Sequence, residues 1–462
     1  MPDISLKRAD KLIECINSFD LEPLRGKDFD RMYCDTHAAR TGSRYINPIA
    51  DLIDDYREAR VCKHMLLMGH RGCGKTTEMY TFIRAMKGEE KKPDERLFGD
   101  KRFLVADISA REYLDLNAAT YVDVLVMMMT ELAKAAQNEK LDLREKAVQP
   151  LLEYWKTIIE KEKIIGFGGT VEVEVSPWDN LLGLFKTLKA KMIAEASTRQ
   201  KIKTQIDPDV NTFINKMWEF NENVQTAWYE KTGQTNLPII VVDDLDRLPL
   251  DRAEDIFYVH GSTLALLPMH VIYTFPIQLS YSSKFNSIKA YFSNTHVLPM
   301  IKLRDWVPGK GYNDTTEGKN VLHNIIEKRA NIKRLFTEPA LNLLIEKTGG
   351  FLRDLFIVIA QAARLANRRE SSKIEEQDAE TALLLLQSEL GRMFHVDHYP
   401  MLRMIYEGKK TDIHSRDEML DLLDGRIIME YNGVRWCDLY PLVEDLLKAT
   451  GVLTDVEREN KP

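Results

Sequence analysis

A short glycine-rich segment, Gly69–Thr76, constrains this chain more than any other feature of its sequence. It reads Gly-His-Arg-Gly-Cys-Gly-Lys-Thr and matches the pattern Gly-x-x-x-x-Gly-Lys-Ser/Thr. The apolar segment His64–Met68 precedes it, and a helical pattern follows it to about Met86. Glycines let the backbone N–H groups of such a loop curl around phosphate groups, and the N-terminal end of the next helix adds positive charge. The segment therefore predicts a phosphate-binding loop between a strand and a helix.

Two side chains of this loop have the chemistry to hold a nucleotide and a metal ion. Lys75 is expected to reach the β- and γ-phosphates of a nucleoside triphosphate, and the Thr76 hydroxyl is expected to ligate Mg²⁺. The side chains of His70 and Arg71 either approach phosphate or point to solvent, and the second arrangement is the commoner one. Cys73 is expected to fill space as a small side chain. The expected phosphate-binding set is Gly69, His70, Arg71, Gly72, Cys73, Gly74, Lys75, Thr76 and Thr77.

A second apolar segment ends in a group of carboxylates, which favours a metal site near the loop. Pro238–Val242 runs directly into Asp243 and Asp244. Ligands of open α/β sheets bind beyond the carboxyl ends of the strands, where these two acids lie. We expect Asp243 to bind Mg²⁺, directly or through water, and Asp244 to orient or deprotonate the attacking water. The role of Asp246 stays open between capping a helix and pairing with Arg247.

Short apolar segments alternate with helical ones through the first two thirds of the chain. Strands separated by helices predict an α/β fold with a parallel sheet covered on both faces. A charged, largely helical segment at about 138–206 interrupts this rhythm and is interpreted as an insertion, in which Val171–Val175 alternates like an exposed strand. The five predicted strands are His64–Gly69, Arg102–Ile108, Pro238–Val242, His270–Phe275 and Val297–Leu303.

The pattern changes after Asp305, where it becomes helical, and it changes again near the end of the chain. There, two helical patterns precede the segment Arg426–Tyr431, the turn pair Asn432-Gly433, the segment Val434–Asp438 and a helix from Pro441. Asn-Gly between apolar alternations is a strong hairpin signal, so a small winged-helix-like module is expected. The predicted helices after Asp305 are Gly318–Arg329, Thr337–Lys347, Phe351–Asn367 and Glu376–Arg392.

Composition excludes several classes of protein. A length of 462 residues suits two to four domains, and the net charge of −7 gives no overall attraction to nucleic acid or anionic membranes. Five scattered cysteines without a Cys-x-x-Cys pair argue against a zinc site or a disulfide framework and favour a reducing compartment. No apolar leader and no membrane-length apolar run stand out. A cytoplasmic protein without membrane contact is expected.

With the phosphate loop and Asp243-Asp244-Leu245-Asp246-Arg247 both placed, the chain resembles the AAA+/STAND division of P-loop ATPases, and within it the origin-recognition-like and STAND groups. The resemblance covers about residues 40–392. It implies a five-stranded parallel sheet in the order 5-1-4-3-2, a helical lid, and binding and hydrolysis of ATP with Mg²⁺. The division of the chain expected from it is a helical segment at 1–60, an ATPase core at 61–305 containing the insertion, a lid at 306–392 and the winged-helix-like module at 393–462.

The same resemblance implies two residues that sense the γ-phosphate and act in catalysis beside Lys75 and Asp244. Thr274 lies on the strand after the acidic one, and its alternative is a hydroxyl that bonds only the backbone. Arg353 ends the run Gly350-Phe351-Leu352-Arg353 at the start of a lid helix. Its alternative is a surface arginine that caps the helix or pairs with Asp354.

The chain also departs from the family. The segment Tyr281–Pro299, where an arginine finger is common, contains no arginine. Arg247, Arg252 and Arg304 are candidates to replace it, although none stands at that place. Asp244 stands where glutamate is usual, and its shorter reach suits the slow turnover of a switch.

Three functions are carried forward. The first is a regulatory ATPase that acts as a nucleotide-dependent oligomerising switch. The run Gly69–Glu78 and the region Leu423–Leu447 look like bacterial ATPases of antiphage systems, which often act beside a separate effector protein. The alternatives are a DNA-binding or DNA-loading ATPase of origin-recognition type and a nucleotide-binding scaffold with little turnover. Acidic residues outnumber basic ones in Met401–Pro462, so a homo-oligomer and an effector protein are the expected partners, and nucleic acid is disfavoured by charge.

Overall fold

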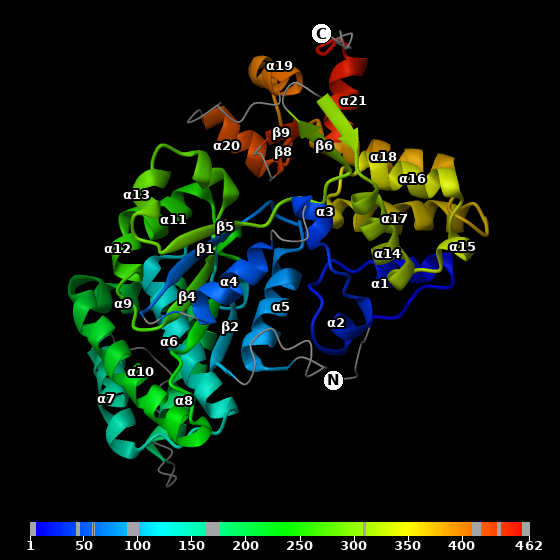
Figure 1. Cartoon of the computed structure of the whole chain (residues 1–462). Helices are drawn as coiled ribbons and strands as arrows, with labels where there is room; N and C mark the ends of the chain where they lie inside the picture. The colour runs from blue at the N-terminus through cyan, green and yellow to red at the C-terminus, as the bar shows by residue number, and fades with distance from the viewer. Residues whose placement is uncertain are drawn as a thin grey trace.

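A computed structural model describes residues 6–42, 47–57, 59, 61–89, 101–161, 176–307, 311–408, 417–431 and 436–454. The expected strand Val171–Val175 and the turn Asn432-Gly433 lie outside these ranges. In Figure 1 the sheet and its helices form one half of the molecule, a helical lid forms the other, and a C-terminal module lies above both. The N-terminal helices α2 (Gly26–Met32) and α3 (His37–Thr41) lie between the two halves.

Five parallel strands form the central sheet in the order β2-β3-β4-β1-β5. Read from the other edge this order is 5-1-4-3-2, so the predicted α/β sheet is confirmed. Every residue of β1, β3 and β4 is buried, which explains why these segments are apolar without alternation. The strands are β1 His64–Met68, β2 Val105–Ser109, β3 Ile239–Asp243, β4 His270–Thr274 and β5 Asn294–Val297.

The predicted fifth strand, Val297–Leu303, is wrong in position. The ladder between β1 and β5 runs from the Met65–Asn294 pair to the Met68–Val297 pair. Pro299 follows two residues later and has no N–H for a further ladder bond. Leu298, Met300 and Ile301 are buried in the hydrophobic cluster of the lid, and their apolar pattern imitates a strand.

Helices cover both faces of the sheet. On one face lie α4 (Pro48–Arg57) and α5 (Lys75–Lys87), and on the other lies α6 (Tyr121–Asn138), most of whose residues are buried. One hydrophobic cluster runs from the sheet through α6 into the helices that follow it, so the segment predicted as an insertion packs onto this core. These helices are α7 Glu145–Lys161, α8 Pro177–Ala194, α9 Ala196–Ile206 and α10 Val210–Thr232. Short helices α11 Leu250–Glu254, α12 Gly261–Leu264 and α13 Phe285–Lys289 connect the later strands.

The lid and the C-terminal module agree with the predicted order of elements, with one addition. Residues Arg304–Val307 (β6) and Gly311–Asp314 (β7) form an antiparallel hairpin where the sequence pattern predicted only helices after Asp305. The lid helices are α14 Thr316–Arg329, α15 Ile332–Leu335, α16 Glu338–Lys347, α17 Leu352–Arg368 and α18 Glu376–Leu390. The C-terminal module consists of α19 Tyr399–Gly408, α20 Asp417–Asp424, the hairpin β8 Ile428–Tyr431 and β9 Trp436–Leu439, and α21 Pro441–Ala449.

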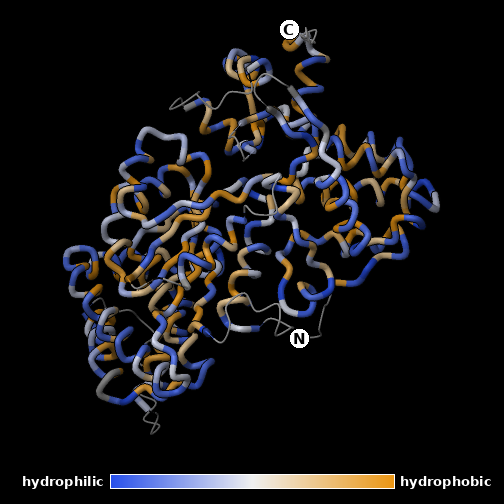
Figure 2. The backbone as a smooth tube through the Cα atoms, in the orientation of Figure 1, coloured by the Kyte–Doolittle hydropathy of each residue, from blue (hydrophilic) through white to orange (hydrophobic). Residues whose placement is uncertain are grey.

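A second hydrophobic cluster joins four parts of the chain that the sequence separates. It contains residues of the N-terminal helix α1 (Cys15–Ser18), the segment Leu298–Ile301, the lid and the C-terminal module. Phe19 meets Phe356 of α17 edge to face, with 5.5 Å between the ring centroids. Figure 2 shows hydrophobic and hydrophilic positions alternating along the lid helices. The predicted four-part division stays a prediction, because this one hydrophobic cluster has members in all four parts.

The connection from the sheet to the lid is held at close range by two glycines. A Cβ atom on Gly350 would lie 2.0 Å from the carbonyl oxygen of Ile301, and one on Gly318 would lie 1.8 Å from that of Lys302. Only glycine lets the backbone approach so closely. The connecting segment is therefore pressed between α14 and the turn before α17.

Three buried histidines are expected to make stability depend on pH. Burial lowers the pKa of His64 and His270 to about 4 and that of His70 to about 3. Above the unfolded pKa of about 6.5 these rings are neutral in both states. As the pH falls below it, the unfolded chain binds protons that the folded chain does not. We expect each histidine to lower the free energy of unfolding by about 1.4 kcal/mol per pH unit between about pH 6.5 and pH 4.

Urea unfolding between neutral pH and about pH 4 measures this effect. Asp243 opposes it, because burial raises the pKa of this carboxyl to about 6 and favours the folded state at low pH. Burial also lowers the pKa of His296, which adds to the effect, and raises those of Asp123 and Asp354, which oppose it. Four histidines against three carboxyls leave an expected net loss of stability on acidification. Replacing His64 with Gln should reduce the slope, and replacing the exposed His323 with Gln should not. Equal slopes for the two variants would contradict this account.

Candidate functional site

The segment Gly69–Thr76 forms a loop at the carboxyl end of β1 and leads into α5. Gly72 and Gly74 have φ angles of +88° and +99°, in the left-handed region that favours glycine. Gly74 precedes α5 without a side-chain cap, so the first N–H groups of the helix remain for a ligand. The predicted strand–loop–helix context of the motif is thus present.

Lys75 is buried within the loop, with 5% of its surface exposed. Its ammonium donates to the carbonyl oxygens of Gly69 and His70 at 2.7 and 3.0 Å and lies 2.8 Å from Oδ2 of Asp246. Burial opposes the charge, but Asp246 holds the pKa of Lys75 above its ordinary value. The open question about Asp246 is therefore answered differently from both alternatives, because its carboxylate pairs with Lys75. An ammonium has three donors, so Lys75 must release one of these partners to bind phosphate.

The two predicted magnesium ligands are in contact. The Thr76 hydroxyl hydrogen-bonds the Asp243 carboxylate, and burial together with Asp246 and Asp244 raises the pKa of Asp243 to about 6. Clustered carboxylates and a hydroxyl are the hard oxygen donors that Mg²⁺ prefers. Among the described residues, no group of three or more His, Cys, Asp and Glu side chains is arranged to hold a metal ion alone. This donor set fits Mg²⁺, which in nucleotide sites takes one or two carboxylates together with substrate phosphates and water.

Asp244 lies in a strained and fully engaged position. Its φ of +66° is uncommon for a residue with a side chain. Oδ1 lies 2.8 Å from Nε of Arg247, while Oδ2 accepts from the Ser109 hydroxyl at 2.6 Å and lies 3.5 Å from Nε of Arg111. The predicted water-polarising carboxylate is thus held on both oxygens. Ser109 is the last residue of β2, and Arg111 lies in the turn that follows it. Neither was predicted, because nothing in their local pattern marks them.

Of the two alternatives for His70 and Arg71, pointing to solvent is wrong for His70, whereas the side chain of Arg71 is 36% exposed. His70 is 2% exposed, and its Nε2 accepts a hydrogen bond from the backbone N–H of Glu430 at 2.8 Å. Arg71 donates to the carbonyl oxygen of Asp246 at 3.1 Å and pairs with Asp424 at 3.1 Å. Both side chains therefore connect the phosphate loop to the C-terminal module. Cys73 is buried, as expected of a small filling side chain.

The two predicted sensor residues lie in different surroundings. Thr274 is completely buried on β4, where its hydroxyl accepts from the N–H of Leu245 at 3.0 Å and donates to the carbonyl of Val242 at 3.3 Å. This is its backbone-bonded alternative. Arg353 begins α17 and lies against the loop, with its N–H donating to the carbonyl of Gly72 at 3.2 Å. A Cβ atom on Gly72 would lie 2.7 Å from Cβ of Arg353, so the lid contacts the loop directly.

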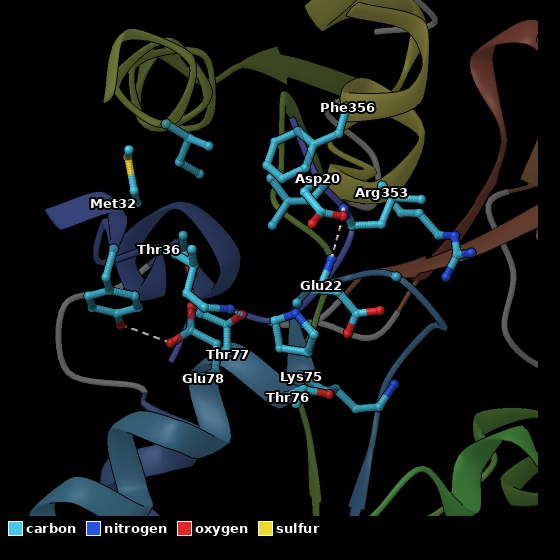
Figure 3. Close-up of a pocket in the computed structure, with 18 of the residues that line it drawn as sticks. Asp20, Glu22, Met32, Thr36, Lys75, Thr76, Thr77, Glu78, Arg353 and Phe356 are labelled. Atoms are coloured by element: carbon cyan, nitrogen blue, oxygen red, sulfur yellow. Dashed lines mark hydrogen bonds between the residues drawn. The ribbon is translucent and has the colours of Figure 1, made fainter. Parts of the chain in front are cut away.

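A pocket joins these groups. Figure 3 shows Lys75, Thr76 and Thr77 of α5 on one side, and Arg353 and Phe356 of α17 on the other. Asp20 and Glu22 of the N-terminal segment lie between them. The N–H of Leu24 donates to the Thr77 hydroxyl at 3.3 Å, and Glu22 pairs with Arg111 at 2.8 Å. No sequence pattern marks this N-terminal wall, which comes from about fifty residues before the loop.

The three candidates for an arginine finger separate clearly. Arg247 lines the pocket. Arg252 lies on α11 and pairs with its neighbour Asp251 at 3.0 Å. Arg304 joins β6 to the C-terminal module through Asp438 at 3.0 Å. Only Arg247 of these three is placed beside the phosphate loop.

Replacing Asp246 with Asn is expected to strengthen nucleotide binding and to lower the stability of the nucleotide-free protein. The variant keeps the shape of the side chain but removes the negative charge that pairs with Lys75 and competes with phosphate for it. We expect nucleotide affinity without added metal to rise roughly 5- to 10-fold, an effect of about 1 kcal/mol. The free energy of unfolding of the empty chain should fall by about 3 kcal/mol, because a buried ammonium loses its counter-ion.

Calorimetric titration with ADP in the presence of a chelator, together with urea unfolding, measures both effects. Asp251→Asn on α11 is the matched control, because this acid is 67% exposed at its side chain and lies outside the pocket. An affinity equal to that of the unaltered chain would show that the Lys75–Asp246 pair does not compete with phosphate.

The sheet has the order β2-β3-β4-β1-β5, with the phosphate loop at the end of β1 in contact with the acids at the end of β3. The fold is that of a P-loop nucleoside triphosphatase. No protein-family model matches the chain, and no curated protein is significantly similar to it in sequence. None of the described helices is both long enough and apolar enough to cross a membrane.

Solved structures resemble the P-loop chain over most of its length. The Aeropyrum pernix ORC2 protein in ADPNP-ADP complexes aligns with 92% of this chain and 98% of its own, at 13% identity and a TM-score of 0.38. Drosophila ORC bound to DNA aligns over 97% and 94% of the two chains, at 12% identity and a TM-score of 0.38. The Thermotoga maritima RuvB Holliday junction branch migration motor covers 88% and 94%, at 10% identity and 0.32. These scores are low, and the resemblance carries no conclusion about function.

Proposed function

We propose that the protein binds ATP with Mg²⁺ and hydrolyses it as a regulatory ATPase of the AAA+/STAND kind. One observation carries the proposal: Lys75, Thr76, Asp243 and Asp244, which come from two distant segments, meet at the end of β1 and β3. An uncapped helix N-terminus and a lysine beside clustered acids are the parts that a triphosphate and its metal need.

Each residue has a defined task in this proposal. Lys75 and the N–H groups of the loop bind the β- and γ-phosphates, and Thr76 and Asp243 hold Mg²⁺, which neutralises phosphate charge when bound. Asp244 orients the attacking water and accepts its proton. Arg353 contacts the γ-phosphate from the lid. Thr274 remains a proposed sensor that acts through the backbone of Leu245, because its hydroxyl bonds that N–H.

Two measurements test the ATPase proposal. Calorimetry with ATP and Mg²⁺ should show binding, and phosphate release should exceed that of Asp244→Ala. Binding without any difference in phosphate release would favour the alternative of a scaffold with little turnover, which the engagement of both Asp244 oxygens also suits. No heat with ATP and Mg²⁺ would contradict both.

We further propose that nucleotide binding controls the C-terminal module, so that the protein works as an oligomerising switch. The support is direct contact between the phosphate loop and the module through His70 and Arg71. Gln278, which follows β4, also donates to Asp424 at 3.1 Å, and Asp354 of the lid accepts from Arg426 at 2.5 Å. A ligand shifts a protein between two arrangements only if it binds them with unequal affinity. In this proposal, phosphates bind the loop that also contacts the C-terminal module, so their affinity depends on how the module is placed.

Particle size and protease sensitivity, each measured with and without an ATP analogue, test the switch. A change in either supports it, and no change in both contradicts it. The effector protein and the role in antiphage defence rest on the likeness of Gly69–Glu78 and Leu423–Leu447 to ATPases of such systems. Purification from the native host with and without nucleotide tests that part. Recovery of DNA instead of a protein would favour the origin-recognition alternative.

A further inference from the structure

The loop after β3 presents an arginine and a carboxylate as one unit. Asp244 and Arg247 are the two ends of a single turn, in which the N–H of Arg247 donates to the carbonyl oxygen of Asp244 at 3.1 Å. Their side chains also pair, at 2.8 Å. The backbone of Asp244 is left-handed, which turns the chain sharply at the end of the strand. Oδ1 of Asp244 is thus held by Arg247, while Ser109 and Arg111 hold Oδ2.

This unit faces the place where the γ-phosphate of bound ATP is expected. Arg247, Asp244, Lys75, Thr76 and Arg353 all line the same pocket. The side chain of Arg247 is 38% exposed, so its guanidinium has room to turn. Arg252 and Arg304, by contrast, are paired elsewhere.

The residues that line the pocket include five arginines, Arg40, Arg71, Arg247, Arg329 and Arg353. Burial lowers the pKa of Arg353 most, and the nearby charges of Arg247, Arg426 and Arg111 lower it further. Within the pocket, the positive charges of Arg247 and Arg353 therefore repel one another in the absence of a polyanion. A triphosphate would relieve this repulsion and offer Arg247 a more highly charged partner than one carboxylate.

We propose that Arg247 is a catalytic residue supplied by the same chain, whose guanidinium moves from Asp244 to the γ-phosphoryl group of bound ATP. The inference rests on the proposed ATPase function. It assigns to Arg247 the role of the arginine finger, for which the segment Tyr281–Pro299 contains no arginine. The exchange has two effects at once. It places positive charge where charge develops in phosphoryl transfer, and it frees Oδ1 of Asp244 to accept a proton from water.

The hydrolytic step balances with these groups. The oxygen of water forms a bond to the γ-phosphorus, and the bond from that phosphorus to the β–γ bridging oxygen breaks. The electron pair stays on the bridging oxygen of ADP, where Lys75 and Arg247 stabilise it. The proton of the water passes to the carboxylate of Asp244. Ser109 and Arg111 continue to hold Oδ2 during this step.

The first test compares Arg247→Ala, Arg247→Lys and Arg252→Ala in single-turnover hydrolysis at saturating ATP. An arginine that contacts the transferred group contributes roughly 10³-fold to the rate. We expect a loss of this order in kcat for Arg247→Ala, a smaller loss for Arg247→Lys and none for Arg252→Ala. The dissociation constant for ATP, measured with a fluorescent analogue, should change by less than about threefold.

A competing explanation predicts the opposite sign. If Arg247 only restrains Asp244, its removal frees the carboxylate, and Arg247→Ala should hydrolyse ATP as fast as the unaltered chain or faster. That result would overturn the inference, as would weaker ATP binding with kcat unchanged. Thermal unfolding of each variant shows whether a loss reflects misfolding, and Arg247→Lys, which keeps the charge, serves if Arg247→Ala does not fold.

The second test asks whether Arg247 acts within its own chain. Lys75→Ala lacks a working loop but keeps Arg247, whereas Arg247→Ala keeps the loop. If Arg247 serves the site of its own chain, mixing the two variants recovers no hydrolysis. Recovery would show action on a neighbouring subunit and would overturn the inference. An unaltered chain without hydrolysis would overturn the ATPase proposal and this inference together, whereas rapid hydrolysis by Arg247→Ala would overturn this inference alone.

Discussion

Lys75→Ala is expected to abolish measurable ATP binding. The ammonium is the charged donor of the loop nearest to the expected phosphates, and its charge-assisted hydrogen bonds to them contribute about 1.5–3 kcal/mol each. Loss of two such bonds weakens affinity roughly 100-fold or more. Calorimetric titration with ATP and Mg²⁺ at equal protein concentrations provides the comparison.

A control on the same helix separates loss of the phosphate contact from general damage. Lys87→Ala removes a lysine from the last turn of α5, outside the pocket, and should bind ATP like the unaltered chain. Lys75→Ala also leaves Asp246 without its cation, so its thermal unfolding must be measured in parallel. A folded Lys75→Ala chain that binds ATP normally would end the nucleotide-site interpretation.

Arg426→Ala is expected to lower the free energy of unfolding by about 3–5 kcal/mol. Its guanidinium donates to Asp354 at 2.5 Å, and Asp354 is completely buried at the start of α17. Removing the arginine leaves a carboxylate in an apolar environment, where an unpaired charge is costly. Since this pair joins the lid to the C-terminal module, we also expect faster proteolysis of that module. Urea unfolding and limited proteolysis measure the two effects.

Two further variants show whether the pair itself is responsible. Arg403→Ala removes an exposed arginine of α19 that donates to the carbonyl oxygen of Val452, and it should cost less than about 1 kcal/mol. Combining Arg426→Ala with Asp354→Asn should recover part of the loss, because no buried charge then remains. Equal losses for Arg426→Ala and Arg403→Ala would contradict this account.

The sheet was predictable because the burial of each strand is visible in its own few consecutive residues. A parallel strand buried on both faces is apolar at every position, as in Ile239–Val242, and the residues that follow it mark the carboxyl edge of the sheet. The same criterion failed at Leu298–Ile301, since burial against the lid produces the same apolar run without a ladder. The hairpin β6–β7 was missed because it is short and partly exposed, and neither strand shows a regular apolar alternation.

The site divides in the same way. Gly69–Thr76 and Asp243-Asp244 are recognisable because each task is encoded in a few consecutive residues. The partners of those residues lie far away along the chain: Ser109 reaches Asp244 across 135 positions, and Glu430 reaches His70 across 360. No periodicity records such a contact. For the same reason the sequence left Asp246 open, since its pairing with Lys75 depends on how β1 and β3 are placed in the sheet.

Gly318 of α14 and Gly350 before α17 hold the segment that connects the sheet to the lid at close range. Leu298, just ahead of the pinched Ile301–Lys302 backbone, donates its N–H to the carbonyl of Met68 at 2.9 Å, directly before the phosphate loop. A tilt of the lid would therefore displace this short stretch of backbone. The stretch is hydrogen-bonded to Met68, which directly precedes the phosphate loop. We therefore expect a change in the angle of the lid to reach the phosphate loop through this backbone connection.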